Sequence, residues 1–283
     1  MHKKDKNMSS NSYVNLATSA HPATILYLVD ISGSMQASMP GGKSRIEVVK
    51  DAIQTSYAAM LKYSLKQGKV RPRYRIGMIA YESELYDVYD GILEIDKIIS
   101  QGIPNLTPQR KTDMAKAFRY AIKLIQDDLK EWTQQWKDEC PPPMVINITD
   151  CEYAEETPDP EPFARQLQDI TVADGNVLVE NIFVTDQIVL TNTDVKEWRG
   201  YRFNETTGDA YGDKLLAMSS PLPSSFAQIM NEQQGLKLRE GTAMMFPGVS
   251  LEFIKTAFVV GTATGGQIPS AAPLRPKTWQ EHD

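Results

Sequence analysis

Three oxygen-bearing side chains follow the first apolar run of the sequence. In the stretch DISGS, a carboxylate and two hydroxyls stand at positions i, i+2 and i+4, as Asp30, Ser32 and Ser34. A strand that ends at Asp30 and turns through Gly33 can direct these side chains at one point. Their oxygens are hard ligands that suit Mg²⁺ or Mn²⁺ and not a metal that prefers thiolates. A turn held by local side-chain to backbone hydrogen bonds is the alternative for so short a pattern.

The same loop continues into a stretch with the composition of a phosphate-binding loop. Residues 37–44, ASMPGGKS, contain the glycine, lysine and hydroxyl of a P-loop, with alanine in the first glycine position. A P-loop must leave its strand directly, so that backbone N–H groups surround the phosphates. Here residues 31–36 intervene, and the glycines and Ser44 also fit a turn that leads into a helix cap. A turn is therefore favoured, and nucleotide binding by residues 37–44 is the alternative.

Two further oxygen groups occur at matching positions later in the chain. Thr112 begins a predicted long helix over residues 112–137, and Asp150 ends the apolar run MVINITD. Asp30 likewise ends the run ATILYLVD, which is typical of a parallel strand buried on both faces. In such sheets, ligands bind outside the carboxyl ends of the strands, where the strand order reverses. Asp30 and Asp150 are therefore expected at one crevice.

Strand and helix signals alternate around these residues. Strands are predicted at 23–30, 74–81, 85–90, 144–150, 176–186 and 243–246, and helices at 44–61, 112–137, 163–170, 212–220, 224–234 and 250–260. This order predicts a Rossmann-like α/β fold, with a doubly wound, mostly parallel sheet, one antiparallel edge strand and helices on both faces. Residues 21–264 are expected to form one domain between flexible tails at 1–20 and 265–283.

Composition excludes several classes of function. The formal charge of −6 and the scattered Lys and Arg residues argue against nucleic acid or an anionic membrane as partner. The histidines, His2, His21 and His282, lie outside the predicted core, which excludes Ser-His-Asp and Cys-His catalysis and histidine-based zinc sites. Apart from the carboxylates that are candidate metal ligands, nothing supplies a general base with a plausible pKa, so a binding module is expected and not an enzyme.

The location is expected to be cytoplasmic. No apolar run approaches the roughly 20 residues that span a bilayer, and the basic N-terminus lacks the apolar region of a signal peptide. Cys140 and Cys151 flank a predicted strand, which would separate them by more than about 20 Å and exclude a disulfide between them. Two reduced thiols fit a cytosolic protein.

The order Asp30, Ser32, Ser34, Thr112 and Asp150 on these elements resembles the metal-ion-dependent adhesion site, or MIDAS, of von Willebrand factor A (vWA) domains. The resemblance covers residues 21–261 and implies the vWA fold. It implies that Ser32 and Ser34 bind Mg²⁺ or Mn²⁺ directly and that Asp30 does so directly or through water. Thr112 would join them in the ligand-ready arrangement, and Asp150 would hold a coordinated water. Capping of a helix or loop is the alternative role for Thr112 and Asp150.

The sequence departs from the family pattern just after Asp150. The family usually has glycine there, whereas this chain has Cys151, followed by a strongly acidic loop over residues 152–161. That loop is expected to be solvated; alternatively, it supplies an internal carboxylate that occupies the metal when no partner is bound. Thr149 is adjacent, but strand alternation is expected to turn it away from Asp150.

The resemblance implies that the protein binds a partner and does not catalyse a reaction. An ion held by neutral hydroxyls, with its acids behind water, keeps an open position that an anionic oxygen fills. The expected partner is a protein that presents an Asp or Glu carboxylate, with metal and partner binding reinforcing each other.

The stretches KLLAMSSPLP and GTAMMF also resemble bacterial cytoplasmic vWA proteins of the tellurium-resistance type. That likeness implies a signalling or stress-response complex with a Ser/Thr kinase and a PP2C-like phosphatase. An adaptor subunit of an AAA+ ATPase is a further alternative.

Overall fold

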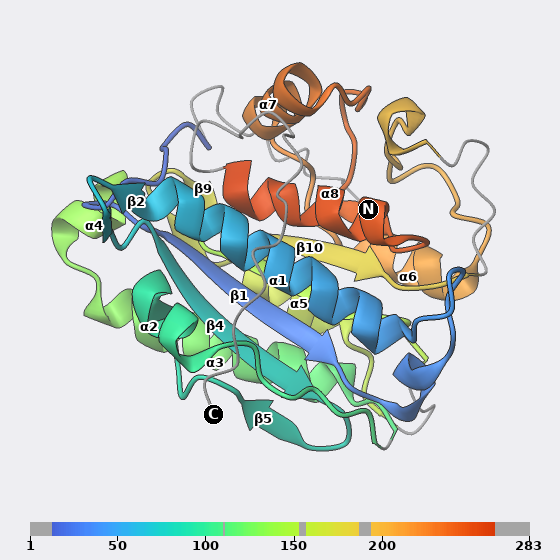
Figure 1. The fold of residues 1–283 in the computed structure, drawn as a ribbon. Coiled ribbons are helices and arrows are strands. Elements are labelled where there is room, and N and C mark those ends of the chain that lie inside the picture. Colours follow the sequence, from blue (N-terminus) through green and yellow to red (C-terminus); the bar gives the residue numbers. More distant parts are fainter. Residues whose placement is uncertain (1–12, 110, 153–156, 187–193, 264–283) are drawn as a thin grey trace.

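A single mixed sheet organises the chain (Figure 1). The structure is a computed structural model that describes residues 13–263 except 110, 153–156 and 187–193. The strands run in the order β11-β10-β7-β1-β4-β5, and β6 also pairs with β4. The parallel strands are β1 (Ala23–Asp30), β4 (Tyr74–Tyr81), β7 (Met144–Thr149), β10 (Leu178–Phe183) and β11 (Met245–Pro247). The antiparallel strands are β5 (Leu85–Asp87) and β6 (Leu93–Glu94).

Helices cover both faces of this sheet. One apolar cluster unites a sheet face with α1 (Arg45–Ser64), α2 (Ile95–Gln101), α7 (Ser224–Gln234) and α8 (Leu251–Ala263). A second cluster unites the other face with α3 (Met114–Glu131), α5 (Glu161–Gln168) and α6 (Ala210–Met218). Within β1, Tyr27 and Val29 belong to the first cluster and Leu26 and Leu28 to the second. The strand is buried along its whole length, which confirms the doubly wound α/β prediction.

The predicted helix over residues 112–137 is wrong in two respects. Helix α3 ends at Glu131, and the shorter α4 (Gln134–Glu139) follows after a break. The break occurs because Trp132 adopts an extended backbone and the Thr133 side chain accepts a hydrogen bond from the Trp136 N–H, which starts a new helix. The apolar periodicity continues through this break, so periodicity alone could not locate it. At the other end, the helix begins at Met114 and not at Thr112.

Short elements that the sequence pattern did not predict lie at the ends of the main ones. They are the hairpin of β2 (Leu65–Lys66) with β3 (Lys69–Val70), the hairpin of β8 (Thr171–Val172) with β9 (Gly175–Asn176), strand β6 with the helix α2 that follows it, and the 3₁₀ helices η1 (Gly33–Gln36) and η2 (Val195–Glu197). Strands of two residues are too short to produce a recognisable alternation of polar and apolar side chains.

The packed part of the chain begins before residue 21. Tyr13 is buried, its N–H donates to the Asp174 carbonyl at 2.7 Å, and its own carbonyl accepts from the Ser225 hydroxyl at 2.7 Å. Ala17 is also buried against the core. Residues 13–20 are therefore part of the domain, which corrects the expected N-terminal tail. The expected C-terminal tail, residues 265–283, lies outside the described residues.

Both cysteines, Cys140 and Cys151, are buried free thiols, as expected. Within residues 13–263 and their stated gaps, no helix combines the length and apolar character that crossing a membrane requires.

Candidate metal-binding site

Two neighbouring strands bring the predicted ligands to one edge of the sheet. After β1 the chain adds β4 on one side, and it later adds β7 on the other side, so the strand order reverses at β1. β1 and β7 pair in parallel register, with Val29 opposite Ile148. The next residues along, Asp30 and Thr149, therefore leave the sheet at the same level, and Asp150 follows directly. This is the position at which doubly wound sheets bind ligands.

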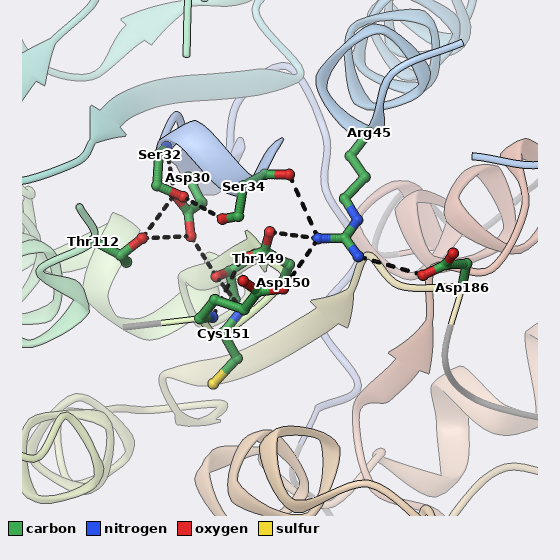
Figure 2. A network of polar contacts seen from close by, with 10 residues as sticks. Asp30, Ser32, Ser34, Arg45, Thr112, Thr149, Asp150, Cys151 and Asp186 are labelled. Atoms are coloured by element: carbon green, nitrogen blue, oxygen red, sulfur yellow. Dashed lines mark hydrogen bonds and ion pairs between the residues drawn. The ribbon is translucent and has the colours of Figure 1, made fainter. Parts of the chain in front are cut away.

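Asp30 lies at the centre of the cluster, and its side chain is fully buried. Its Oδ1 accepts the Ser32 backbone N–H at 2.8 Å, and its Oδ2 accepts the Thr149 hydroxyl at 2.6 Å (Figure 2). The Thr112 hydroxyl lies 3.4 Å from each carboxylate oxygen. Burial, and next the charge of Asp150, raise the pKa of Asp30 to about 7, although the hydrogen bonds from Thr149 and Ser32 oppose the rise.

The two serines of the first loop lie side by side. Ser32 Oγ and Ser34 Oγ are 3.0 Å apart, with Ser32 buried and Ser34 half-buried at the start of η1. The spacing i, i+2 and i+4 after a strand thus places both hydroxyls beside the Asp30 carboxylate, as the sequence predicted. Ser34 is the most exposed of these side chains, so the cluster opens towards solvent on its side.

Thr112 does not cap the helix that follows it. Asp113 is the N-cap of α3, and its side chain accepts the Lys116 N–H at 2.9 Å. The capping alternative for Thr112 is therefore wrong, and its buried hydroxyl is directed at Asp30 instead (Figure 2).

Asp150 forms a buried ion pair that sequence reasoning missed. Arg45 Nη1 donates to Asp150 Oδ2 at 2.8 Å, and the two side chains are only 7% and 1% exposed. The same guanidinium reaches the Ser34 carbonyl at 3.5 Å, Glu152 Oε1 at 3.4 Å and Asp186 Oδ1 at 3.4 Å. Arg45 thus joins the first loop to the loops that follow β7 and β10 (Figure 2). Arg45 is the first residue of α1, directly after the Ser44 cap. Nothing in the sequence distinguishes it from a solvated arginine at the start of a helix.

Thr149 is the second residue that sequence reasoning missed. Strand alternation, which turns Thr149 away from Asp150, led to its exclusion from the site, but its buried hydroxyl donates to Asp30 and accepts the Cys151 N–H at 2.8 Å. The signal was available in principle, because parallel strands that end at the same edge place their last side chains next to each other. It required the register between β1 and β7, which one sequence does not supply.

Cys151 occupies the position where the vWA pattern usually has glycine, and its backbone explains the preference. Its φ is +59°, in the left-handed region that glycine adopts without steric cost. The chain therefore keeps the tight turn after Asp150 with a buried side chain in place of glycine. In this turn the Glu152 N–H also donates to Asp150 Oδ1 at 3.2 Å.

The described acids of the loop after Asp150 pair with cations. Glu152 contacts Arg45, Asp159 lies 2.6 Å from Lys214 Nζ, and Glu161 pairs with Arg165. Glu155 and Glu156, the other acids that could occupy the metal from within the chain, lie outside the described residues.

Residues 37–44 form a turn and not a loop that leaves its strand directly. The 3₁₀ helix η1 separates β1 from this segment, Ser38 and Ser44 form a bridge, and Gly41 and Gly42 have positive φ angles. Ser44 then caps α1 in a reciprocal capping box with Glu47. Lys43 is exposed and its Nζ lies 2.5 Å from Asp51 Oδ2, so its ammonium faces a carboxylate and not a phosphate cradle.

The donor set suits a hard divalent cation. It combines one buried carboxylate with the hydroxyls of Ser32, Ser34 and Thr112, and no cationic side chain pairs with Asp30 among the described residues. The described part of the chain contains no cluster of three or more His, Cys, Asp or Glu residues that could hold a metal. The site is instead built mainly from hydroxyls, with few acids, and such a donor set fits Mg²⁺ or Mn²⁺.

Comparison with known proteins gives similar structures and one matching sequence family. No curated protein sequence matches it. Proximal thread matrix protein 1 from the mussel byssus is similar in structure, with a TM-score of 0.50 at 12% identity over 86% of this chain and 48% of that chain. The PilB minor pilin of Streptococcus sanguinis has a TM-score of 0.50 at 11% identity over 89% of this chain and 64% of that chain. This chain therefore spans about half the length of the mussel protein, and these likenesses establish the fold alone.

The segment match identifies the domain. Residues 25–151 match the von Willebrand factor type A domain family. This segment runs from β1 to the turn after β7 and contains Asp30, Ser32, Ser34, Thr112 and Asp150. The chain therefore contains a von Willebrand factor type A domain.

Proposed function

We propose that this protein is a protein–protein interaction module that depends on Mg²⁺ or Mn²⁺. The observation that carries the proposal is the convergence of a buried carboxylate, Asp30, with the hydroxyls of Ser32, Ser34 and Thr112 at the strand-order reversal of a vWA domain. Such domains commonly mediate protein contacts. The site lacks a histidine, and both of its acids have roles in holding the ion and its water, so recognition suits it better than catalysis.

Each residue has a distinct role in this proposal. Ser32, Ser34 and Asp30 would hold the ion, Thr112 would join them when a ligand is bound, and Asp150 would hold a water. The ion would supply an electrophilic position that an anionic oxygen fills. Arg45 fixes the Asp150 carboxylate before any ligand arrives, because the ion pair and the Ser34 carbonyl contact connect the loops.

The partner we propose presents an Asp or Glu side chain. The Arg45 guanidinium offsets the charge of Asp150, so an incoming carboxylate meets less repulsion than two bare acids would cause. As the setting, we propose a cytoplasmic bacterial signalling or stress-response complex with a Ser/Thr kinase and a PP2C-like phosphatase. That part rests on the likeness of KLLAMSSPLP and GTAMMF to tellurium-resistance-type proteins.

A peptide selection tests this function and the chemistry of the partner together. Random peptides displayed on phage are selected on the immobilised protein in Mg²⁺ and eluted with EDTA, with Thr112→Ala protein as the matched control. We expect the eluted peptides to share an Asp or Glu whose replacement by Asn or Gln abolishes binding. Peptides that bind equally in EDTA, or equally to Thr112→Ala, would contradict the proposal.

A further inference from the structure

One stretch of this acidic protein carries only positive charge. Between Asp51 and Glu82 the sequence has no acidic residue, but it contains Lys62, Lys66, Lys69, Arg71, Arg73 and Arg75. The basic residues of the chain, which look scattered in its overall composition, are thus locally concentrated. The stretch comprises the second half of α1, the β2–β3 hairpin and β4.

Part of this stretch surrounds a polar pocket of about 280 Å³. Its walls include the cations Lys66, Arg71 and Arg73 and the hydroxyl-bearing residues Thr18, Tyr63 and Ser64, and no acidic residue lines it in the described structure. Within that same part of the chain, none of the three cations forms an ion pair. Arg75 differs, because its guanidinium is paired with Asp128 at 2.6 Å.

Hydrogen bonds hold the Arg73 guanidinium and the backbone around the pocket in place. Arg73 donates from Nε to the Ala17 carbonyl at 2.8 Å and from Nη1 to the Tyr63 carbonyl at 3.4 Å. The Arg71 N–H donates to the Ser64 carbonyl at 2.8 Å. Lys66 precedes the hairpin turn Gln67-Gly68, in which both residues have the positive φ that a two-residue turn requires. The Arg73 guanidinium and the backbone that carries Lys66 and Arg71 are therefore positioned before any ligand binds.

Two hydroxyls of the pocket wall are buried and have no hydrogen-bond partner among the described residues. They are Ser64 Oγ, in a residue that is only 1% exposed, and Tyr63 Oη. Burial raises the pKa of Tyr63 to about 12, so this phenol remains a donor. Buried polar atoms without partners are uncommon and call for an explanation. Donors beside unpaired cations are what an oxyanion requires.

We propose that this pocket binds a phosphate-type oxyanion, as a second ligand site that is independent of the metal site. Guanidinium groups donate two parallel hydrogen bonds to phosphate oxygens, and the nearby cations match a dianion better than a carboxylate. Helix α1 begins at Arg45 beside the metal site and runs along the sheet to Ser64, which lines the pocket (Figure 1). The pocket therefore lies at the opposite ends of the strands from the metal site. The 20 residues of α1 separate the two sites by roughly 30 Å.

Calorimetric titration with inorganic phosphate at constant ionic strength tests this site. Lys69 pairs with Lys66 across the hairpin but does not line the pocket, so Lys69→Ala removes the same charge from the same element. We expect Lys66→Ala and Arg71→Ala to weaken phosphate binding at least about tenfold, because hydrogen bonds to charged groups are lost. Lys69→Ala should change it less than twofold. Absence of phosphate binding by the wild type, or an equal loss in Lys69→Ala, would overturn the proposal.

Two phosphate monoesters then distinguish the source of the ligand. Tighter binding of O-phosphoserine than of glycerol 3-phosphate would indicate a phosphorylated side chain, and the reverse order would indicate a small metabolite. In either case Arg71→Lys, which keeps the charge but loses the planar fork, should bind more weakly than the wild type and more tightly than Arg71→Ala. Monoesters that do not bind where phosphate does would contradict a biological phosphate site.

Discussion

Arg45 and Asp150 form a buried ion pair between the first residue of α1 and the residue that follows β7, with 2.8 Å between Nη1 and Oδ2. The guanidinium also reaches the Ser34 carbonyl and Asp186. One side chain therefore connects the loops after β1, β7 and β10. Arg45 is not itself a candidate metal ligand, but it fixes the loops that carry the candidate ligands.

Replacing Arg45 by methionine should strongly destabilise the fold. The variant leaves the Asp150 carboxylate buried without its cation, close to the second buried acid, Asp30. Breaking a buried pair by removing one partner costs about 3–5 kcal/mol in free energy of unfolding, which urea titration measures. Lys43→Ala is the matched control, because it removes a cation from the exposed pair with Asp51 and should leave stability unchanged. Equal effects of the two variants would contradict a structural role for Arg45.

The strands of the site were predictable because their residues determine them locally. The run that ends at Asp30 is continuously apolar, as a strand covered on both faces must be, and β1 has the predicted bounds Ala23–Asp30. The spacing of Ser32 and Ser34 after that strand then placed their hydroxyls together. Thr112 and Asp150 followed from a family pattern, and Thr112 does reach Asp30.

The remaining features depend on contacts between residues that are distant in the chain. The Arg45–Asp150 pair joins positions 105 residues apart, and the Thr149–Asp30 hydrogen bond joins positions 119 apart. Neither follows from periodicity or composition. The break between α3 and α4 was missed for a different reason, because a threonine cap interrupted a helix whose apolar stripe continued.

Glu180 should make the stability of the domain depend on pH. It is fully buried in β10, and within the described part of the chain neither carboxylate oxygen has a hydrogen-bond partner. Burial therefore raises its pKa well above the ordinary value. The folded state keeps the proton that the unfolded chain loses near pH 4.5, so wild-type stability should fall above that pH by about 1.4 kcal/mol per unit until the folded-state pKa is reached.

Glu180→Gln removes this titration and provides the measurement. The stability of the variant relative to the wild type should increase with pH between about 5 and 7 in urea titrations. The test depends on how this stability difference changes with pH and not on its absolute size, because the cost of burying the amide does not change with pH. Glu131→Gln, which removes a carboxylate at an exposed position of α3, is the matched control. Parallel stability curves for wild type and Glu180→Gln would mean that Glu180 is ionised in the fold.

Substitution of Cys151 should distinguish the backbone requirement from side-chain packing. Glycine relieves the left-handed φ of +59° but loses a buried side chain, so the two effects should nearly cancel in Cys151→Gly. Valine keeps a buried apolar side chain, but its branched Cβ opposes the same φ. Cys151→Val should therefore be less stable than Cys151→Gly by about 1–3 kcal/mol in thermal or urea unfolding. A more stable valine variant would show that the turn after Asp150 tolerates another backbone conformation.

Metal binding by the cluster around Asp30 is the central claim, and calorimetric titration of Mn²⁺ tests it most directly. The proteins are the wild type, Asp30→Ala, Thr112→Ala and Lys43→Ala, with MgATP titrated in parallel and folding checked by circular dichroism. We expect the wild type and Lys43→Ala to bind Mn²⁺ equally, Thr112→Ala to bind about tenfold more weakly, Asp30→Ala not to bind, and MgATP to give no heat that depends on Lys43. A folded wild type that does not bind Mn²⁺, or that binds MgATP in a manner that depends on Lys43, would contradict the account.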